Sequence, residues 1–535
     1  MRRILRGPRK YIAVLLIIAL IGPAARIGDD FFEISKNLEI FSDLYKNINL
    51  YYADDTKPGS LMKTGIDAML NSLDPYTTYI PESRMEDYRF MTTGQYGGIG
   101  SLIRTIEGHV FISEPYQGFP AQKAGMIAGD RIIKVDGEDV EHKTQEEISE
   151  ALKGSPGSKV KIEVLRDYKE LTFEVEREEI KIPDVPYSAM LDDKTGYIKL
   201  NGFTRTASKE VREAYNQLKT EGMENVVLDL RGNGGGLLQE AVNIVNFFVP
   251  RGTEVVSTKG KIEEWDRVHK ALNEPLSTEI PVAVLIDGGS ASASEIVSGT
   301  LQDLDRAIIV GERSFGKGLV QQTKDIAYGS KLKITVAKYY TPSGRCIQKL
   351  DYFAKENGGR AEAVPDSLIK EFRTMNGRPV FDGKGINPDV EVEGEEMGKI
   401  IGGLFQGNYF FHYANEFARE HKEIDNADEF SLSDADYDAF VAWLSDKEVQ
   451  YTTETQDALD KLIKKSKKEK YYEDSEEELE KLTKELAPHA AEDVIRFKDQ
   501  IKYILESEII ARYSYQNGRI VHGLRDDPVI EAVLD

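Results

Sequence analysis

Hydrophobic positions along the chain follow two periods, which separate helical stretches from strand-rich ones. Residues 31–93 repeat apolar positions at helical spacing, interrupted by the Leu-Asp-Pro run at residues 73–75. The period shortens near residue 96, where short alternating runs begin and predict a small β-rich domain. These runs lie at residues 101–104, 109–112, 131–135, 159–165 and 171–175.

From about residue 187 continuous apolar strands alternate with helices, as in a sheet that is covered by helices. The predicted strands are 196–200, 225–230, 282–286, 307–310 and 331–340, and the predicted helices are 208–218, 237–248 and 294–304. After about residue 395 the chain becomes helical and highly charged. The pattern therefore predicts a multidomain α/β protein with helical regions at both ends.

The N-terminus has the pattern of an export signal. Five cations precede an apolar run at residues 11–21, and Gly-Pro-Ala-Ala follows it. The run is short for a membrane span, so both a cleaved signal and an uncleaved anchor remain open. A buried N-terminal helix is the less favoured alternative. We expect residues 1–28 to direct export, either to the periplasm or to the outer face of the inner membrane.

Composition excludes several classes of function. A net charge of −23 over 535 residues leaves no broad basic surface for nucleic acid. Cys346 is the only cysteine, which rules out an internal disulfide and a cysteine-based zinc site. A His-Glu-x-x-His motif is absent from the sequence, which disfavours a metalloprotease. We therefore expect no metal and no organic cofactor.

Candidate chemistry lies in the run Gly-Ser-Ala-Ser-Ala-Ser-Glu at residues 289–295, between a predicted strand and a predicted helix. A serine at such a turn is exposed, and the helix start offers backbone N–H groups to a developing oxyanion. The alternative is structural, with Ser294 capping the helix and the other serines filling a tight turn.

A nucleophilic serine needs a base, and none of the seven histidines lies near this turn in sequence, although a histidine triad is not excluded. Lys317 lies in a glycine-rich loop after the next strand, and a desolvated lysine can accept the serine proton. A surface ammonium in a turn is the competing interpretation. The run Asp-Leu-Arg-Gly-Asn-Gly-Gly-Gly at residues 229–236 could bring a second N–H donor to the site.

These three runs together resemble the carboxyl-terminal processing proteases, also called tail-specific proteases. Residues 120–125 and 129–137 look like the PDZ domain that these enzymes carry, and the likeness extends over residues 31–392. In the family the serine and lysine are 25 positions apart, which selects Ser292 rather than Ser290 or Ser294 as the partner of Lys317.

The resemblance implies a Ser/Lys dyad in a crotonase-like α/β core with an inserted PDZ domain. Gln321 would orient Lys317, and backbone N–H groups of Gly235 and Ala293 would bind the oxyanion. The PDZ domain would grip the carboxyl-terminal tail of protein substrates. The residues implied for this grip are Tyr96, Gly97, Gly98, Ile99 and Arg166. Arg166 would also help to couple peptide binding to activation.

The expected organisation is a signal or anchor (1–28), a helical region (29–95), a PDZ domain (96–180), a protease core (181–395) and a charged helical region (396–535). Partners would be proteins with exposed carboxyl-terminal tails; membrane anchoring, oligomers and adaptors stay open.

Two other functions compete with that of a protease. A nucleotide-binding protein is suggested by residues 311–317, a near-match to a phosphate loop, but Gly318 stands where a Ser or Thr should reach magnesium. The residues after it also do not read as a helix. The second is a catalytically inactive PDZ-bearing scaffold that only binds peptides. ATP-independent cleavage and a serine-reactive probe would separate these alternatives from a protease.

Overall fold

The computed structural model describes residues 31–352 and 361–535, so the predicted export signal lies outside the described residues. The described residues divide into two compact units, one formed by those up to residue 79 together with 323–334, the other by those from residue 80 to 322 and from 335 onward. Within the described residues, no helix combines the length and apolar character that a membrane crossing requires.

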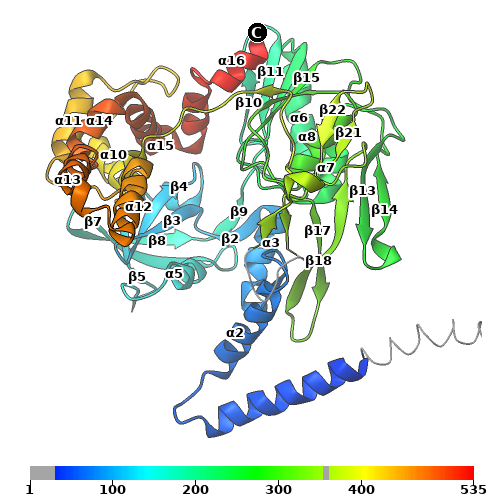
Figure 1. The fold of residues 1–535 in the computed structure, drawn as a ribbon, viewed down its shortest axis with the longest axis horizontal. Coiled ribbons are helices and arrows are strands. Elements are labelled where there is room, and N and C mark those ends of the chain that lie inside the picture. The colour runs from blue at the N-terminus through cyan, green and yellow to red at the C-terminus, as the bar shows by residue number, and fades with distance from the viewer. Residues whose placement is uncertain (1–30, 353–360) are drawn as a thin grey trace, which may run out of the picture. The chain divides into compact units, whose positions relative to one another are not determined.

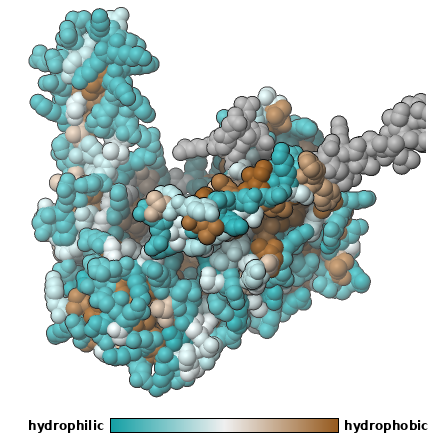
Figure 2. All heavy atoms as spheres, turned by 90° about the horizontal axis from the view of Figure 1, so that it is seen from below, coloured by the Kyte–Doolittle hydropathy of each residue, from teal (hydrophilic) through white to brown (hydrophobic). Residues whose placement is uncertain are grey.

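The first unit is mainly helical, as the apolar period predicts. A helix covers residues 31–51, and α2 (Pro58–Asn71) ends just before the Leu-Asp-Pro run. The helix over residues 31–51 keeps large apolar side chains exposed, among them Phe31, Phe32 and Leu38. Figure 2 shows hydrophobic residues gathered in patches on the face of the molecule seen from below.

A stretch that was predicted as purely helical then contains a short strand, β1 (Thr78–Ile80). Its backbone turn is set by Asp74, whose carboxylate accepts hydrogen bonds from the N–H groups of Tyr76 and Thr77. A 3-10 turn η1 (Glu82–Arg84) and helix α3 (Met85–Thr93) follow, and Gly94 ends α3 in the left-handed conformation.

The β-rich domain forms where the alternating runs predict it. Its sheet has the order β3-β4-β5-β7-β8, with β6 paired to β5, and helices α4 and α5 pack on its core. Strand β2 pairs separately with β9. The bounds are β2 (Gln95–Gly98), β3 (Ser101–Ile106), β4 (His109–Pro115), α4 (Pro120–Lys123), β5 (Arg131–Val135), β6 (Glu138–Asp139), α5 (Gln145–Leu152), β7 (Lys159–Arg166), β8 (Lys169–Glu176) and β9 (Glu178–Lys181).

The α/β core is a six-stranded sheet with the order β10-β11-β12-β15-β16-β23, parallel except for β10. Alternate residues of its strands face opposite sides, so continuous apolar runs bury both faces. The strands and helices are β10 (Tyr187–Met190), β11 (Thr195–Lys199), α6 (Ala207–Thr220), β12 (Asn225–Asp229), α7 (Leu238–Val245), β15 (Val282–Ile286), α8 (Ala293–Asp303), β16 (Ile308–Gly311) and β23 (Val390–Glu391).

Different helices cover the two faces of this sheet (Figure 1). On one face, Leu228 and Val284 join a large core with α6, α7 and α8. On the other face, Val227 and Leu285 pack against Ile530 of the C-terminal helix α16 (Pro528–Leu534). The predicted strands and helices of the core are confirmed, whereas the sequence pattern did not indicate that the last helix of the chain covers its second face.

A second sheet and two hairpins contain the other described strands of residues 254–381. Strand β13 pairs with β14 on one side and β18 on the other, and β17 pairs with β18. The bounds are β13 (Glu254–Gly260), η2 (Glu263–Trp265), β14 (Arg267–Lys270), β17 (Leu319–Asp325), β18 (Lys331–Tyr340), β19 (Leu350–Asp351), β20 (Glu362–Ala363), η3 (Asp366–Leu368), β21 (Glu371–Arg373) and β22 (Pro379–Phe381).

The charged C-terminal region forms helices around an aromatic core that includes Phe410, Tyr437 and Phe440. The elements are α9 (Lys399–Gln406), α10 (Tyr409–Glu420), α11 (Asp434–Leu444), α12 (Glu454–Glu469), η4 (Glu473–Ser475), α13 (Glu476–Glu485), α14 (Ala490–Arg496) and α15 (Lys498–Leu524). Its charge run therefore lies on the solvated faces of helices that bury an apolar core.

This helical region contacts the β-rich domain through charged and aromatic groups. Arg519 of α15 lies 3.4 Å from the Glu114 carboxylate, and Arg104 stacks over the ring of Phe411. Tyr515 accepts a hydrogen bond from Gln122 at a point where the backbone of α15 leaves helical geometry. The C-terminal helices therefore contact both the β-rich domain and the α/β core.

Candidate active site

The serine-rich turn leaves the carboxyl end of β15 and enters α8, as predicted. Ser292 is half-buried at the start of α8, with φ of 57° and ψ of −110°. A positive φ is uncommon for a residue other than glycine and stores strain, which is found most often at functional sites. The alternative in which Ser294 caps the helix is wrong. Ser292 holds the N-cap position, and Ser294 lies within the first turn of α8.

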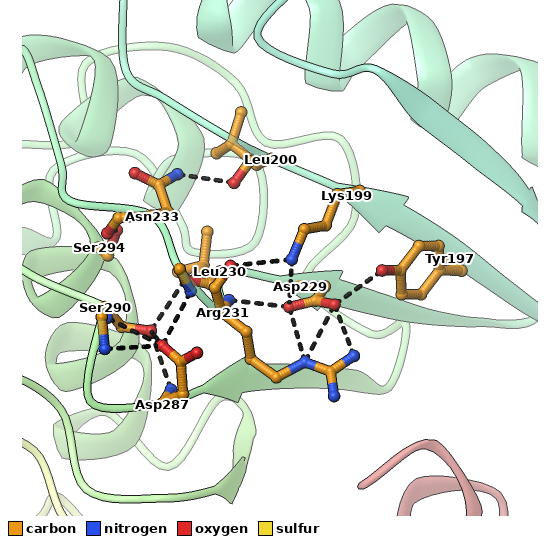
Figure 3. Close-up of polar contacts among 12 residues, drawn as sticks. Tyr197, Lys199, Leu200, Asp229, Leu230, Arg231, Asn233, Asp287, Ser290 and Ser294 are labelled. Carbon is orange, nitrogen blue, oxygen red and sulfur yellow. Dashed lines mark hydrogen bonds and ion pairs between the residues drawn. The ribbon is translucent and has the colours of Figure 1, made fainter. Parts of the chain in front are cut away.

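The neighbouring serines hold the turn instead of capping the helix. Ser290 and Ser294 are buried, and their hydroxyls donate to the carbonyl oxygens of Leu230 and Asn233, each at 2.8 Å. Figure 3 shows both serines beside the loop that follows β12. The serine-rich turn and the glycine-rich loop after β12 are therefore bound to each other on either side of Ser292.

Lys317 follows β16, which pairs in parallel with β15, so both loops leave the same edge of the sheet. Lys317 is half-buried. The residues after it form strand β17, which confirms the prediction that they do not form the helix of a phosphate loop.

Glu295 joins the two loops. One carboxylate oxygen accepts the N–H groups of Ser292 (2.8 Å) and Lys317 (2.9 Å), so the two nitrogens lie within two hydrogen-bond lengths of each other. The other oxygen accepts the Ser314 hydroxyl and the Gly316 N–H. Glu295 is fully buried, and burial raises its pKa although the four hydrogen bonds oppose the shift.

Tyr339 of β18 makes a second connection between the same two residues. Its buried hydroxyl lies 2.7 Å from the carbonyl oxygen of Lys317 and 3.2 Å from that of Ser292. Burial and the nearby Glu295 carboxylate raise the pKa of Tyr339, so its hydroxyl stays protonated and can donate. The backbone of both candidate catalytic residues is thus held at the N–H and at the carbonyl.

The predicted oxyanion donors lie side by side. Gly235 has φ of 99°, and a Cβ there would meet the Ala291 carbonyl at 2.6 Å, so only glycine fits against the turn. Its N–H donates to the side-chain oxygen of Asn233 at 2.9 Å, so its oxyanion role requires that N–H to leave Asn233. Ala293 begins α8, and its N–H therefore has no acceptor within the helix.

Gln321 lies on β17, four residues after Lys317, and its side-chain nitrogen donates to the Thr335 hydroxyl at 3.3 Å. Its orienting role stays a prediction. The described part of the chain contains no group of three or more His, Cys, Asp or Glu side chains placed to hold a metal ion.

The residues expected to grip a peptide tail lie at one end of the β-rich domain. Tyr96, Gly97 and Gly98 belong to strand β2, which pairs with β9, and only Ile99 and Gly100 form the turn into β3. Burial raises the pKa of Tyr96 to about 12, although hydrogen bonds from the backbone of Ser101 and Gly100 to the phenol act to lower it. The phenol oxygen therefore lies at the N–H groups that open β3.

Arg166 is bound within its own domain. Its guanidinium lies 2.6 and 2.7 Å from the two carboxylate oxygens of the buried Asp130 and donates to the Gly125 carbonyl. Its coupling role stays a prediction. The peptide-binding role of the residues at the β2–β3 turn also stays a prediction.

Sequence reasoning missed Glu295, Tyr339 and Asn233. Glu295 follows Ser292 by three positions, the spacing of a capping box, which was a usable signal. No local pattern marks Tyr339, because its role depends on how β18 packs against two distant loops.

Three family models match parts of the chain. The model of peptidase family S41 matches residues 194–352, the PDZ domain model matches 111–166, and a model described as a probable PDZ-protease C-terminal helical domain matches 400–535. Among solved structures, a photosystem II D1 C-terminal processing protease is 27% identical, with 66% of this chain and 92% of that one covered and a TM-score of 0.36.

Two curated relatives are similar over most of their length. A probable CtpA-like serine protease of Staphylococcus aureus is 33% identical over 64% of this chain and 69% of its own. A carboxy-terminal-processing protease of Bartonella bacilliformis is 35% identical over 58% of this chain and 73% of its own. Because the chain covers more than two thirds of both relatives at 35% and 33% identity, it belongs to the carboxy-terminal-processing proteases, serine-type peptidases that here carry a PDZ domain and a helical C-terminal domain.

Proposed function

We propose that this protein is an exported endopeptidase in which Ser292 is the nucleophile and Lys317 is its base. The observation that carries the proposal is the Glu295 carboxylate, which holds the N–H groups of both residues on one oxygen. A buried charged acceptor shared by two loops fixes their separation, as a serine and its base require.

In the proposed reaction, the neutral Lys317 amine takes the Ser292 proton while Oγ attacks the carbonyl carbon of the scissile peptide bond. The resulting oxyanion is bound by the Ala293 N–H and, once released from Asn233, by the Gly235 N–H. Collapse of the tetrahedral intermediate breaks the C–N bond, and the lysine gives its proton to the leaving amine. Lys317 then activates a water molecule, which releases the acyl group and restores the serine. A crotonase-like core is part of this proposal, supported by the parallel sheet that carries both loops.

The PDZ domain is proposed to bind the carboxyl-terminal tail of the substrate along strand β3. This strand pairs with β4 on one edge, and its other edge is occupied by Gln145, whose amide bonds to the backbone of Thr105 and Ile103. A peptide that adds to this edge would replace those bonds, as in β-strand addition. Its carboxylate would replace the Tyr96 phenol at the N–H groups of Gly100 and Ser101.

Export, to the periplasm or to the outer face of the inner membrane, is proposed from the basic and apolar pattern of residues 1–28. It can be tested by locating the full-length protein after cell fractionation.

We expect cleavage of an unstructured protein to depend on its free carboxyl end. Amidation of that end removes a charged acceptor and should lower kcat/KM about 10-fold or more, since a charged hydrogen bond contributes about 1.5–3 kcal/mol. The same protein with a blocked amino end is the matched control. Equal cleavage of the amidated and free substrates would contradict recognition of the tail, without bearing on the dyad.

The rate should also rise with pH from mildly acidic to alkaline conditions, because only the unprotonated lysine amine can accept the serine proton. The measurement is kcat/KM of a short substrate whose only ionisable group is its carboxyl end, which stays charged over this range. A flat profile over this range would count against lysine as the base.

A further inference from the structure

The end of the chain is part of the protease core. After α15, the short turn 525–527 leads into α16, whose Ile530 is buried against the second face of the core sheet. The strands under α16 include β12 and β15, which carry the glycine-rich loop and the nucleophile turn. Residues at the start of α16 therefore lie close to the loops of the proteolytic site.

Asp527 connects α16 to one of these loops. One carboxylate oxygen caps the helix by accepting the N–H of Val529 at 2.9 Å. The other oxygen lies 2.7 Å from the Arg231 guanidinium, and both side chains are mostly buried. The cap fixes the position of the carboxylate, so it offers Arg231 a rigid partner.

Arg231 is held between two carboxylates. Its Nε and Nη2 atoms contact the buried Asp229, and its Nη1 atom contacts Asp527 (Figure 3 shows the Asp229 side). Lys199 lies 3.2 Å from Asp229 and donates to the Arg231 carbonyl. Burial alone would lower the pKa of Arg231, but the two carboxylates raise it above its ordinary value. This cluster has two positive and two negative groups, and Asp527 is the member that comes from the C-terminal region.

Arg231 begins the loop that reaches Ser292. The next residue, Gly232, donates its N–H to Asp287 in the nucleophile turn, and Gly235 lies against the backbone of residues 291–293. A shift of Arg231 would therefore move Gly235 relative to Ser292. Because catalysis is sensitive to displacements of about 1 Å, anchoring at the start of this loop affects the rate.

We infer that Asp527 is a positioning residue of the proteolytic site, which holds the glycine-rich loop in place through Arg231. The helical C-terminal domain thereby completes the protease core, in addition to contacting the PDZ domain. This inference goes beyond the proposed dyad and uses different residues.

The test separates positioning from helix capping. Asp527→Ser keeps a good helix cap but is too short to reach Arg231. Asp527→Asn keeps one acceptor oxygen, which can face the helix N–H or the guanidinium but not both. We expect Asp527→Ser to lower kcat about 10- to 100-fold with KM changed less than about twofold, since displaced oxyanion donors cost rates of this order. Asp527→Asn should lose less. The rate at which a fluorophosphonate labels Ser292 should fall in parallel with kcat.

Asp526→Asn is the matched control. The Asp526 side chain is next to Asp527 in sequence but is 89% exposed, so this substitution should leave kcat unchanged. Thermal unfolding of all variants reports whether α16 stays docked. Wild-type kcat in a folded Asp527→Ser protein would overturn the inference, and so would a loss of kcat that only follows a lower Tm. Cleavage that survives in Ser292→Ala would instead contradict the dyad, so the two ideas fail separately.

Discussion

The Ser292→Ala variant is expected to cleave an unstructured protein about 10⁴-fold or more slowly than the wild type, without ATP or added metal in either case. Removal of a nucleophile costs about 10⁶-fold in a well-studied serine protease, and the residual rate comes from binding and oxyanion donors. Lys317→Ala should lose a similar factor, since residues that act as one unit do not contribute additively. The assay is the initial rate of product formation, followed by mass spectrometry of the fragments.

Ser290→Ala and Ser294→Ala serve as matched controls in the same turn. Ser294→Ala loses its hydrogen bond to the Asn233 carbonyl, and Ser290→Ala loses its bond to the Leu230 carbonyl together with two bonds to Asp287, each worth about 1 kcal/mol. Both variants keep Ser292, so each should keep activity within about 10-fold and still react with a fluorophosphonate. If Ser294→Ala were inactive and Ser292→Ala active, the nucleophile would be misassigned. If no protein, including the wild type, cleaved the substrate, the inactive peptide-binding scaffold would be favoured.

The sequence was sufficient to predict the core strands and the serine turn, because their signals are local. A buried parallel strand is a continuous apolar run, and a sharp turn into a helix needs small residues, as at 289–295. The choice of Ser292 over Ser290 or Ser294 required the family spacing. The structure adds a physical difference, since the other two hydroxyls are already used in hydrogen bonds.

Other features could not be predicted because they join parts of the chain that are far apart in sequence. Tyr339 meets the Ser292 carbonyl across 47 positions, and Asp527 reaches Arg231 from the last helix of the chain. The charged composition of the C-terminal region suggested only solvated helices. Its last helix nevertheless buries Ile530 on the core sheet, because an amphipathic pattern does not reveal which partner its apolar face will meet.

Glu295→Gln is expected to lower kcat about 100-fold although Ser292 and Lys317 are both still present. The amide keeps the size of the carboxylate but replaces one acceptor oxygen with a donor. In one orientation the NH₂ group faces the N–H groups of Ser292 and Lys317, and in the other it faces the Ser314 hydroxyl and the Gly316 N–H. The hydrogen bonds of one of these two pairs are therefore disrupted. The Ser292 and Lys317 loops should then separate, and a misplacement of about 1 Å costs about 10²-fold. The measurement is kcat together with the fluorophosphonate labelling rate.

Glu295 is fully buried, so Glu295→Gln also leaves buried donors without an acceptor, and each costs about 1–3 kcal/mol of stability. The free energy of unfolding of this variant must therefore be measured together with kcat. Ser314→Ala is the milder companion, which removes one of the four donors and keeps the carboxylate on Ser292 and Lys317. It should stay folded and keep activity within about 10-fold. A folded Glu295→Gln protein with wild-type kcat would show that the shared carboxylate does not hold the dyad.

The pH dependence gives an independent test of the same carboxylate. Burial raises the pKa of Glu295, so the charged form is lost at a higher pH than for an ordinary glutamate as the solution is acidified. Protonation turns one acceptor oxygen of Glu295 into a donor, so one of the hydrogen bonds to the Ser292 or Lys317 loop is lost. The rate should therefore fall as the pH is lowered through the raised pKa of Glu295. This fall adds to the loss caused by protonation of Lys317. In Glu295→Gln only the lysine contribution should remain, and the acid limb should become correspondingly less steep. An unchanged acid limb in that variant would mean that Glu295 does not titrate in the working range and supports the loops only as a fixed charge.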